Sequence, residues 1–187
     1  MLKKIFPSLL ILLFASSSIT AQTQSHKKKP VETKPSTFNC PKFREIKWGA
    51  VKDSILINGV APTFVKAKMK EDTNAYYLQD DDMTIGTVFC KNIYYWFNPA
   101  GRLVKVRMVV PKAQKSDMKY ILESKFEKAT SIFDLTNAYE LIWNNIEEVR
   151  LTLTDYDDPN IDFVTVEFTS DFEMTEAKKI NRAVDDF

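Results

Sequence analysis

Residues that enzymes commonly use for catalysis are scarce in this chain of 187 residues. Its only histidine, His26, lies in a polar stretch near the N-terminus, so the rest of the chain lacks a histidine base for a serine or cysteine nucleophile. Zinc sites built on histidine are excluded for the same reason. The four glycines, Gly49, Gly59, Gly86 and Gly101, lie far apart, so they form neither a phosphate-binding loop nor a dinucleotide-binding motif.

Cysteine is equally scarce, with Cys40 and Cys90 as the only two in the chain. In an oxidising compartment these two could form a disulfide that closes a loop of about 50 residues and contributes about 4 kcal/mol to stability. Two buried free thiols are the alternative, because a free cysteine behaves as a small apolar residue. The sequence leaves both interpretations open.

No apolar run in the chain is long enough to span a membrane, and the longest one lies at the N-terminus. A basic head, Met1 to Lys4, is followed by the apolar run Ile5 to Phe14 and then by small polar residues up to Ala21. This run is shorter than the roughly 20 residues that a membrane-spanning helix needs, and the pattern is typical of a secretory signal peptide. We therefore predict a signal peptide at residues 1–21, cleavage after Ala21, and an exported protein that is periplasmic or secreted and has no further transmembrane segment.

The chain has no strong excess of charge of either sign. Residues 22–37 are rich in Gln, Ser, Thr, Lys and Pro and have little to bury, which predicts a disordered leader. The full chain has 26 basic and 25 acidic residues; without the six lysines and one glutamate that precede Phe38, 20 basic and 24 acidic residues remain. Residues 38–187 have the length of a single globular domain, and their mildly acidic balance argues against nucleic acid as a partner.

The clearest structural signal is the stretch from Ile93 to Val110, which predicts a β-hairpin. Its two β-rich runs flank Asn98-Pro99-Ala100-Gly101, where proline and glycine suit a chain reversal. Successive side chains of a strand point to opposite faces, and in the return strand apolar residues alternate with basic ones, so one face of the hairpin belongs to the core. The predicted core side chains are Ile93, Tyr95, Phe97, Val104, Val106, Met108 and Val110, and the opposite face carries Tyr94, Trp96, Lys105 and Arg107.

Other stretches predict further strands and helices. Asn58-Gly59 between apolar residues predicts a tight hairpin turn, after which Pro62 delays an edge strand to Phe64. Apolar residues at helical spacing predict one helix with Ser116 as its N-cap and a second, terminal helix after Ser170. Further strands are predicted at residues 76–78, 84–89, 139–143, 149–154 and 163–168.

These elements indicate an α+β fold, with an antiparallel β-sheet and helices packed on one face. The hairpin at residues 93–108 resembles a second one at 139–153, since each has an aromatic-bearing strand that returns as a strand with a basic outward face. If the segment Phe43–Gly49 takes the place of a helix in the first half, the domain could consist of two degenerate αβββ units. Two unrelated hairpins that look alike are the alternative.

Several short motifs resemble a known group of proteins. Phe43 to Gly49 reads F-x-x-I-x-W-G, Tyr95 to Leu103 contains an aromatic strand and a G-x-L return, and a helix with Leu122 and Phe126 precedes a strand with Trp143. These motifs resemble small exported domains of unknown function that are common in Bacteroidetes, and the layout resembles that of β-lactamase-inhibitor-protein-like domains. The resemblance implies a small exported α+β domain and no catalytic residue.

The hairpin also carries the candidate binding residues. Tyr94 and Trp96 lie close to Lys105 and Arg107 on the face opposite the predicted core. If this face is exposed, an aromatic and basic patch of this kind would bind a sugar, a peptide or a partner protein. If a helix or the leading segment covers it, the aromatic residues belong to the core instead.

Acidic residues offer a weak candidate for a cation site. Asp155, Asp157, Asp158 and Asp162 crowd one predicted loop, and their oxygen atoms are ligands that calcium prefers. The spacing lacks the glycine and the final glutamate of an EF-hand loop, so solvated turn residues are the simpler explanation. We therefore predict neither a metal ion nor a cofactor.

Composition and motifs together favour a binding domain over an enzyme. We expect an exported, non-enzymatic binding or interaction domain for an unknown protein or cell-envelope partner. The alternative is a small hydrolase of the cell envelope that works with two carboxylates, the acid and base chemistry that this composition still permits. Facing carboxylates in a concave pocket would favour the hydrolase, and a flat or grooved binding face would favour the binding domain.

Overall fold

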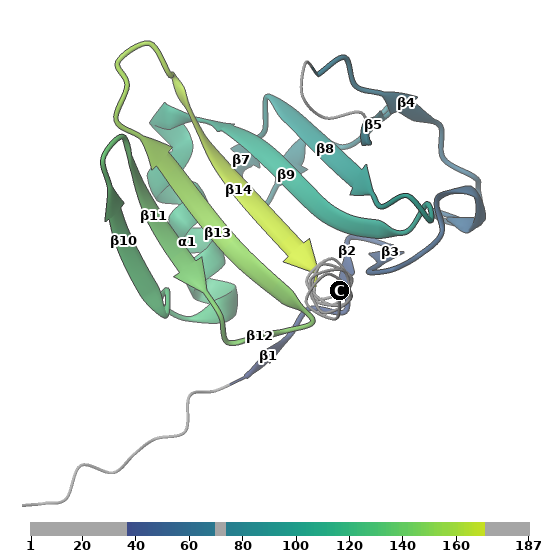
Figure 1. Cartoon of the computed structure of the whole chain (residues 1–187), viewed down its shortest axis with the longest axis horizontal. Helices are drawn as coiled ribbons and strands as arrows, with labels where there is room; N and C mark the ends of the chain where they lie inside the picture. The colour runs from purple at the N-terminus through teal and green to yellow at the C-terminus, as the bar shows by residue number, and fades with distance from the viewer. Residues whose placement is uncertain (1–36, 70–73, 171–187) are drawn as a thin grey trace, which may run out of the picture. The chain divides into compact units, whose positions relative to one another are not determined.

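A computed structural model describes residues 37–69 and 74–170, which lie in one unit of the chain that starts at Pro35. The described residues form an eight-stranded antiparallel sheet in the order β10-β11-β13-β14-β9-β8-β5-β4, together with one α-helix, α1 (Lys115–Phe126) (Figure 1). The predicted α+β class with an antiparallel sheet is thus confirmed. The strands of this sheet are β4 (Phe64–Lys66), β5 (Ala75–Leu78), β8 (Asn92–Phe97), β9 (Leu103–Pro111), β10 (Ser131–Leu135), β11 (Ala138–Trp143), β13 (Val149–Tyr156) and β14 (Phe163–Ser170).

Short strand pairs and turns complete the described part of the chain. The parallel pair consists of β1 (Phe38–Asn39) and β12 (Ile146–Glu147). The two antiparallel pairs are β2 (Lys42–Phe43) with β3 (Ile46–Lys47) and β6 (Thr84–Ile85) with β7 (Val88–Phe89). Two 3-10 turns cover Lys52–Ser54 and Lys112–Gln114, and the second leads into α1.

The predicted hairpin at residues 93–110 is confirmed as β8 and β9. The two strands pair antiparallel, with Ile93 opposite Met108. At the turn, the Gly101 N–H donates a 2.8 Å hydrogen bond to the Asn98 carbonyl, and Gly101 has a φ of +72°, which glycine adopts without steric strain. The predicted core side chains that belong to the main apolar core are Ile93, Tyr95, Phe97, Val106, Met108 and Val110.

Val104 lies on the other face from the one that the sequence pattern predicts. The pairing of the two strands shifts at a bulge, because Trp96 faces Lys105 whereas Phe97 faces Leu103. One extra residue in β9 at this bulge reverses the alternation, and Val104 packs with Trp96 in a small cluster on the opposite face. The sequence pattern assumed an unbroken ladder.

The turn at Asn58-Gly59 and the edge strand after it are also confirmed. Ile57 and Val60 exchange backbone hydrogen bonds of 2.8 and 3.0 Å across the turn, and β4 begins at Phe64. In contrast, the single strand predicted at residues 84–89 is wrong. Gly86, with a φ of +59°, turns the chain there and divides the stretch into β6 and β7.

The eight strands form two groups of four that meet at the centre of the sheet. β4, β5, β8 and β9 precede α1 in the sequence, and β10, β11, β13 and β14 follow it. Each group runs from one edge of the sheet to the centre, where β9 pairs with β14 (Figure 1). In the sequence, the hairpin of β8 and β9 resembles that of β11 and β13. In the sheet, however, β8 and β9 are the two innermost strands of their group, and the two innermost strands of the other group are β13 and β14.

α1 confirms the first predicted helix but begins before the predicted cap. Because the 3-10 turn Lys112–Gln114 continues into α1, the N-cap is Gln114, and Ser116 lies inside the helix. Glu127 follows the last helical residue with a φ of +60°, a region that glycine occupies more readily than other residues. The buried side chains of α1 are Met118, Leu122 and Phe126.

One apolar core joins α1, the opening segment and one face of the sheet. The Phe126 ring of α1 lies 6.2 Å from the Phe38 ring and 6.4 Å from the Phe168 ring, between centroids. Phe43, Ile46 and Trp48 belong to the same core, as the opening segment predicts. We call the sheet face that carries Leu151 and Leu153 the covered face and the face that carries Thr152 and Thr154 the open face.

Three predictions fall on residues that the structure does not describe. They are the signal peptide at residues 1–21, the leader at residues 22–37 except for its last residue, and the terminal helix after Ser170. These three stay predictions.

Candidate functional site on the open face of the sheet

Polar side chains line the open face because they alternate with core residues along each strand. On β13, Thr152 and Thr154 alternate with Leu151 and Leu153, which are fully buried. Tyr156, at the end of the strand, lies on the same face as the two threonines. Successive side chains of a strand point to opposite faces, so this pattern gives one apolar and one polar face. Threonine also suits the open face because β-branched residues favour the extended backbone.

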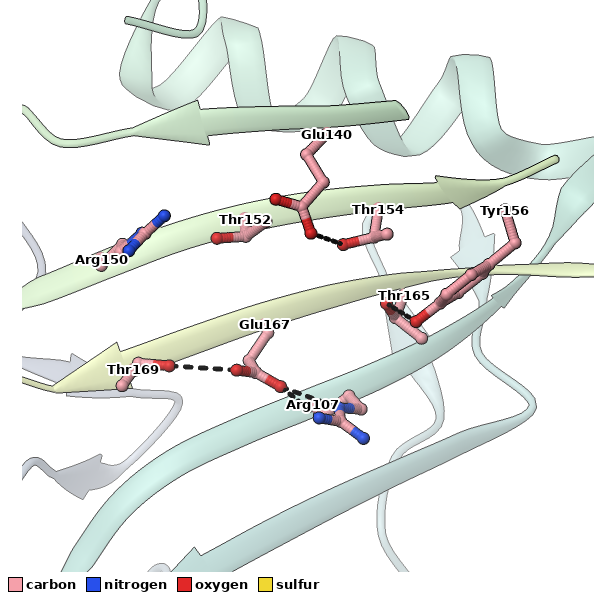
Figure 2. Close-up of a pocket in the computed structure, with 9 residues that line it drawn as sticks. All are labelled: Arg107, Glu140, Arg150, Thr152, Thr154, Tyr156, Thr165, Glu167 and Thr169. Carbon is pink, nitrogen blue, oxygen red and sulfur yellow. Dashed lines mark hydrogen bonds and ion pairs between the residues drawn. The ribbon is translucent and has the colours of Figure 1, made fainter. Parts of the chain in front are cut away.

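This face contains a hollow of about 370 Å³ (Figure 2). Four adjacent strands, β11, β13, β14 and β9, supply its lining. Its nine lining residues are Arg107, Glu140, Arg150, Thr152, Thr154, Tyr156, Thr165, Glu167 and Thr169. All nine have a group that donates or accepts hydrogen bonds, so the hollow suits a polar ligand.

Glu167 lies at the centre of a charged cluster in this hollow. Arg107 donates to Glu167 Oε2 from Nε at 2.8 Å, and its Nη2 atom lies 2.6 Å from the same oxygen. Lys105 Nζ lies 3.6 Å from Oε1, and the Thr169 hydroxyl donates to that oxygen at 3.2 Å. Two cations therefore share one carboxylate.

Arg150 adds a third cation at the rim of the hollow. Its side chain is exposed, and its residue pairs with Thr169 across β13 and β14. Figure 2 shows its guanidinium apart from the dashed contacts, and no hydrogen bond or ion pair joins it to another of the described residues. A guanidinium in this position presents several N–H donors in the planar arrangement that binds carboxylate and phosphate groups.

Hydrogen bonds hold the remaining polar side chains of the hollow. The Thr154 hydroxyl donates to Glu140 Oε1 at 3.2 Å, and the hydroxyls of Tyr156 and Thr165 lie 3.3 Å apart. These contacts link β11 to β13 and β13 to β14. These contacts and those of Glu167 fix most of the side chains of the hollow in place, whereas Arg150 stays unpaired among the described residues.

The predicted binding residues Tyr94, Trp96, Lys105 and Arg107 do come together at one end of the open face. Trp96, however, is only 5 % exposed. Lys105 Nζ lies 5.8 Å and Arg107 Cζ 5.0 Å from the centroid of the Trp96 ring, so both cations contact the indole. Half-buried Tyr94 packs beside it with a centroid distance of 5.9 Å.

Residues just after β4 and at the start of β5 cover Trp96. It forms a cluster with Ala67, Ala75 and Val104, and Met69 packs against this cluster. Among the described residues, this cover comes from the stretch after β4 and the start of β5 and not from α1. The accessible part of the predicted patch therefore consists of Tyr94, Lys105 and Arg107, which are half-buried, and does not include Trp96.

The candidate calcium ligands do not converge on one point, because their carboxylates bind different side chains. Asp155 Oδ2 accepts a 2.6 Å hydrogen bond from Lys115, and Asp162 Oδ2 accepts one of the same length from Lys91. Asp158 accepts from Asn160, and Asp157 is exposed. Within residues 37–69 and 74–170, no three His, Cys, Asp or Glu side chains are placed to hold one metal ion.

Cys40 and Cys90 are buried free thiols in the structure. Burial raises the pKa of both, that of Cys90 to about 11. The thiolate is the reactive form of cysteine, so both side chains should be poor nucleophiles at neutral pH.

A second polar cluster lies on the covered side and was missed by the sequence analysis. The Tyr95 hydroxyl donates a 2.9 Å hydrogen bond to Asp81 Oδ2, and Arg44 forms an ion pair with the other oxygen of the same carboxylate. Burial is the main reason why the pKa of Asp81 and that of Tyr95 are both raised. The contacts tie the turn between β2 and β3 to the bend after β5, which indicates a structural role.

No protein family, curated protein or solved structure matches this chain in comparisons with known proteins. The resemblance to small exported Bacteroidetes domains therefore stays a prediction. No helix within the described residues is both long and apolar enough to cross a membrane.

The sequence places Arg150 on the outward face of a predicted strand, but neither Arg150 nor Glu167 nor the threonines of the open face was predicted to form a site. The signal that would have found them is the alternation in residues 149–154 and 164–169, where polar residues separate apolar ones at every second position. The same alternation that predicts the strands also predicts a polar face that carries these residues.

Proposed function

We propose that this protein is an exported, non-enzymatic binding domain that recognises a protein or cell-envelope partner through the open face of its sheet. The observation that carries this proposal is the hollow of about 370 Å³ lined by polar side chains from four adjacent strands. Ligand sites are concave, and precisely placed polar groups in them fix the orientation of the ligand. Support for export comes from the signal-peptide pattern at residues 1–21.

The charges in and beside the hollow favour an acidic partner. Lys105, Arg107 and Arg150 face two carboxylates, Glu140 and Glu167, which leaves one positive charge in excess. A basic surface attracts acidic groups and increases the rate at which they bind. A carboxylate-bearing or otherwise anionic segment of the partner would meet the guanidinium of Arg150 first, because that side chain is exposed.

The arrangement of the acidic residues favours binding over hydrolysis. Glu140 lies on β11 and Glu167 on β14, and β13 separates the two strands. Neighbouring strands lie about 4.8 Å apart, so roughly 10 Å separates the backbones of the two residues. A hydrolase needs its two carboxylates free to face each other across the bond that it cleaves. Both carboxylates also have protein partners, Thr154 and Arg107.

We also infer that the domain is built from two degenerate copies of an αβββ-like unit. The strand order supports two copies, because β4, β5, β8 and β9 run from one edge of the sheet to its centre and β10, β11, β13 and β14 run there from the other edge. Each copy would then have four strands in the sheet, one more than an αβββ unit has. In this arrangement α1 belongs to the second copy, and the segment Phe43–Gly49 takes its place in the first. The open face of the two central strands, β9 and β14, would then lie at the junction of the copies.

Site-specific photo-crosslinking in the source organism tests the binding proposal. A benzophenone amino acid replaces either Thr152, in the hollow, or Tyr120, which is 73 % exposed on α1. We expect a covalent adduct with a partner from position 152 and none from position 120. Adding Arg150→Glu to the first variant should reduce the adduct at least tenfold, and Lys128→Glu, the same charge change at an exposed position after α1, should leave it unchanged. Equal adducts from both positions, or an adduct that Arg150→Glu leaves intact, would contradict the proposal.

A further inference from the structure

β10 is an edge strand whose side chains are exposed on both faces of the sheet. Within the described residues it pairs with β11 alone and so forms one end of the eight-stranded sheet. Ile132 is 61 %, Phe133 48 % and Leu135 47 % exposed. Alternate N–H and C=O groups of such a strand point away from the sheet, which makes it a template for a further strand.

The opposite edge of the sheet has the features that protect edges. β4 has three residues, it follows Pro62, and the exposed Lys66 and Lys68 lie at its end. Short length, proline and lysine are the means by which proteins prevent edge-to-edge association. β10 has five residues with the sequence Ser-Ile-Phe-Asp-Leu, without proline or lysine. One edge is thus protected and the other is not.

We propose that β10 pairs with the β10 strand of a second copy of this chain, antiparallel and centred on Phe133. In this register Phe133 faces its own counterpart, Ile132 faces Asp134 of the second copy, and Ser131 faces Leu135 of the second copy. The interface is then two-fold symmetric, as interfaces of homodimers usually are. The two eight-stranded sheets become one continuous sheet.

The sequence of β10 fits a second copy because it complements itself. The strand has one charged residue, Asp134, and the proposed register places it opposite Ile132, so like charges do not face each other. The partner strand must bury apolar side chains on both faces of the sheet, and β10 offers Ile132 on one face and Phe133 and Leu135 on the other. Two Phe133 rings at the two-fold axis would form a cross-strand aromatic pair, which contributes to pairing.

The proposal is independent of the function proposed above. It rests on the edge of the sheet, whereas the binding proposal rests on the hollow. The two are compatible, because pairing uses the free edge of β10 and leaves the hollow open. Phe133 faces Glu140 in the β10–β11 ladder and therefore lies on the open face. Pairing through β10 would place two open faces side by side on one sheet.

Sedimentation velocity of the secreted protein over a concentration series tests the pairing. A five-residue strand pair is smaller than a standard protein interface, so we expect a dimer that dissociates in the micromolar range. Phe133→Lys should raise the dissociation constant at least tenfold, because it places two like charges at the axis. The matched substitution on the protected edge, Val65→Lys in β4, should leave it unchanged. A monomer at every concentration up to about 1 mM, where a specific interface of this kind would be populated, would overturn the proposal.

Cysteine substitutions test the register and separate a second copy from a foreign strand. Facing residues of an antiparallel pair are close enough for a disulfide, so Phe133→Cys should give a covalent dimer under mild oxidation. Ile132→Cys should not, because Ile132 faces Asp134 of the second copy. The native cysteines are buried and should not interfere. A dimer that Phe133→Lys does not weaken, or equal crosslinking at both positions, would show that the copies do not associate through β10 in this register.

Discussion

The covered and open faces of the sheet are made by the same strands, but different forces hold their side chains. On β13, Leu151 and Leu153 are buried in the core, while Thr152 and Thr154 between and beside them line the hollow. The covered face depends on close packing, and the open face depends on hydrogen bonds and ion pairs such as that of Arg107 with Glu167. Substituting a residue of the covered face should therefore lower stability, whereas substituting its neighbour on the open face should weaken binding.

The largest effect is expected from a pair of substitutions on adjacent residues of β13. Leu151→Ala should lower the free energy of unfolding by about 3–4 kcal/mol, because it leaves a cavity at a fully buried position. Thr152→Ala, one residue further on, should change it by less than about 0.5 kcal/mol. Urea unfolding measures both. Similar losses for the two variants would show that the open face is part of the folding core and would remove the distinction.

Trp96 is an exception to this difference between the faces, because it lies on the open face and yet is buried. Trp96→Ala should lower the free energy of unfolding by about 2–3 kcal/mol, less than a deletion in the main core, because the cluster around it is small. Trp96→Phe keeps most of the packing and should lose about 1 kcal/mol. Chemical unfolding followed by circular dichroism compares the two variants. If Trp96→Ala keeps its full stability, the residue is available for a ligand after all.

Local patterns in the sequence were sufficient for most strands of the eight-stranded sheet. Alternation predicts β8, β9, β11, β13 and β14, and the Asn58-Gly59 pair predicts its turn, because these features depend on neighbours in the chain. β10 escaped the prediction for a physical reason. Its apolar residues are exposed on both faces, so the strand shows neither an alternating nor a helical pattern.

The candidate site could not be predicted because it depends on pairing between distant strands. Arg107 and Glu167 are 60 residues apart and meet because β9 pairs with β14 at the centre of the sheet. The sequence predicts both strands but does not say that they are neighbours. The cover over Trp96 is a similar case, since Ala67 and Ala75 flank a connection that no local pattern assigns to that face.

The end of α1 offers a substitution that should strengthen the covered side. Glu127 has a φ of +60° and a ψ of −164°, a backbone conformation found almost only for glycine. Glu127→Gly should raise the free energy of unfolding by about 1 kcal/mol by relieving this strain. Its carbonyl would still accept the 2.9 Å hydrogen bond from Trp143 Nε1. Glu127→Ala removes the same side chain without relieving the strain, so thermal unfolding of the two variants separates the causes; equal stability would argue against strain.

The smallest effect is expected at Asp155, where an ion pair fastens the start of α1 to the covered side of β13. Burial raises the pKa of Asp155, but hydrogen bonds and charges from Lys115 and Lys112 outweigh this and hold it below its usual range. The Nζ atoms of the two lysines lie 2.6 and 3.4 Å from the carboxylate oxygens. A carboxyl group whose pKa is lowered by folding stabilises the folded state above its unfolded pKa and loses this contribution as the pH falls through its folded-state pKa.

Asp155→Asn should therefore lower the free energy of unfolding at pH 7 by less than about 1 kcal/mol, as partly exposed ion pairs do. The difference from the unsubstituted protein should shrink below about pH 4 and vanish at still lower pH, where the carboxyl group is protonated in both states. Asp157→Asn, the same change at an exposed position two residues on, is the matched control. Urea unfolding at several pH values measures both variants. A loss at Asp155 that persists unchanged into acid would mean that packing of the side chain, and not its charge, holds α1 to the sheet.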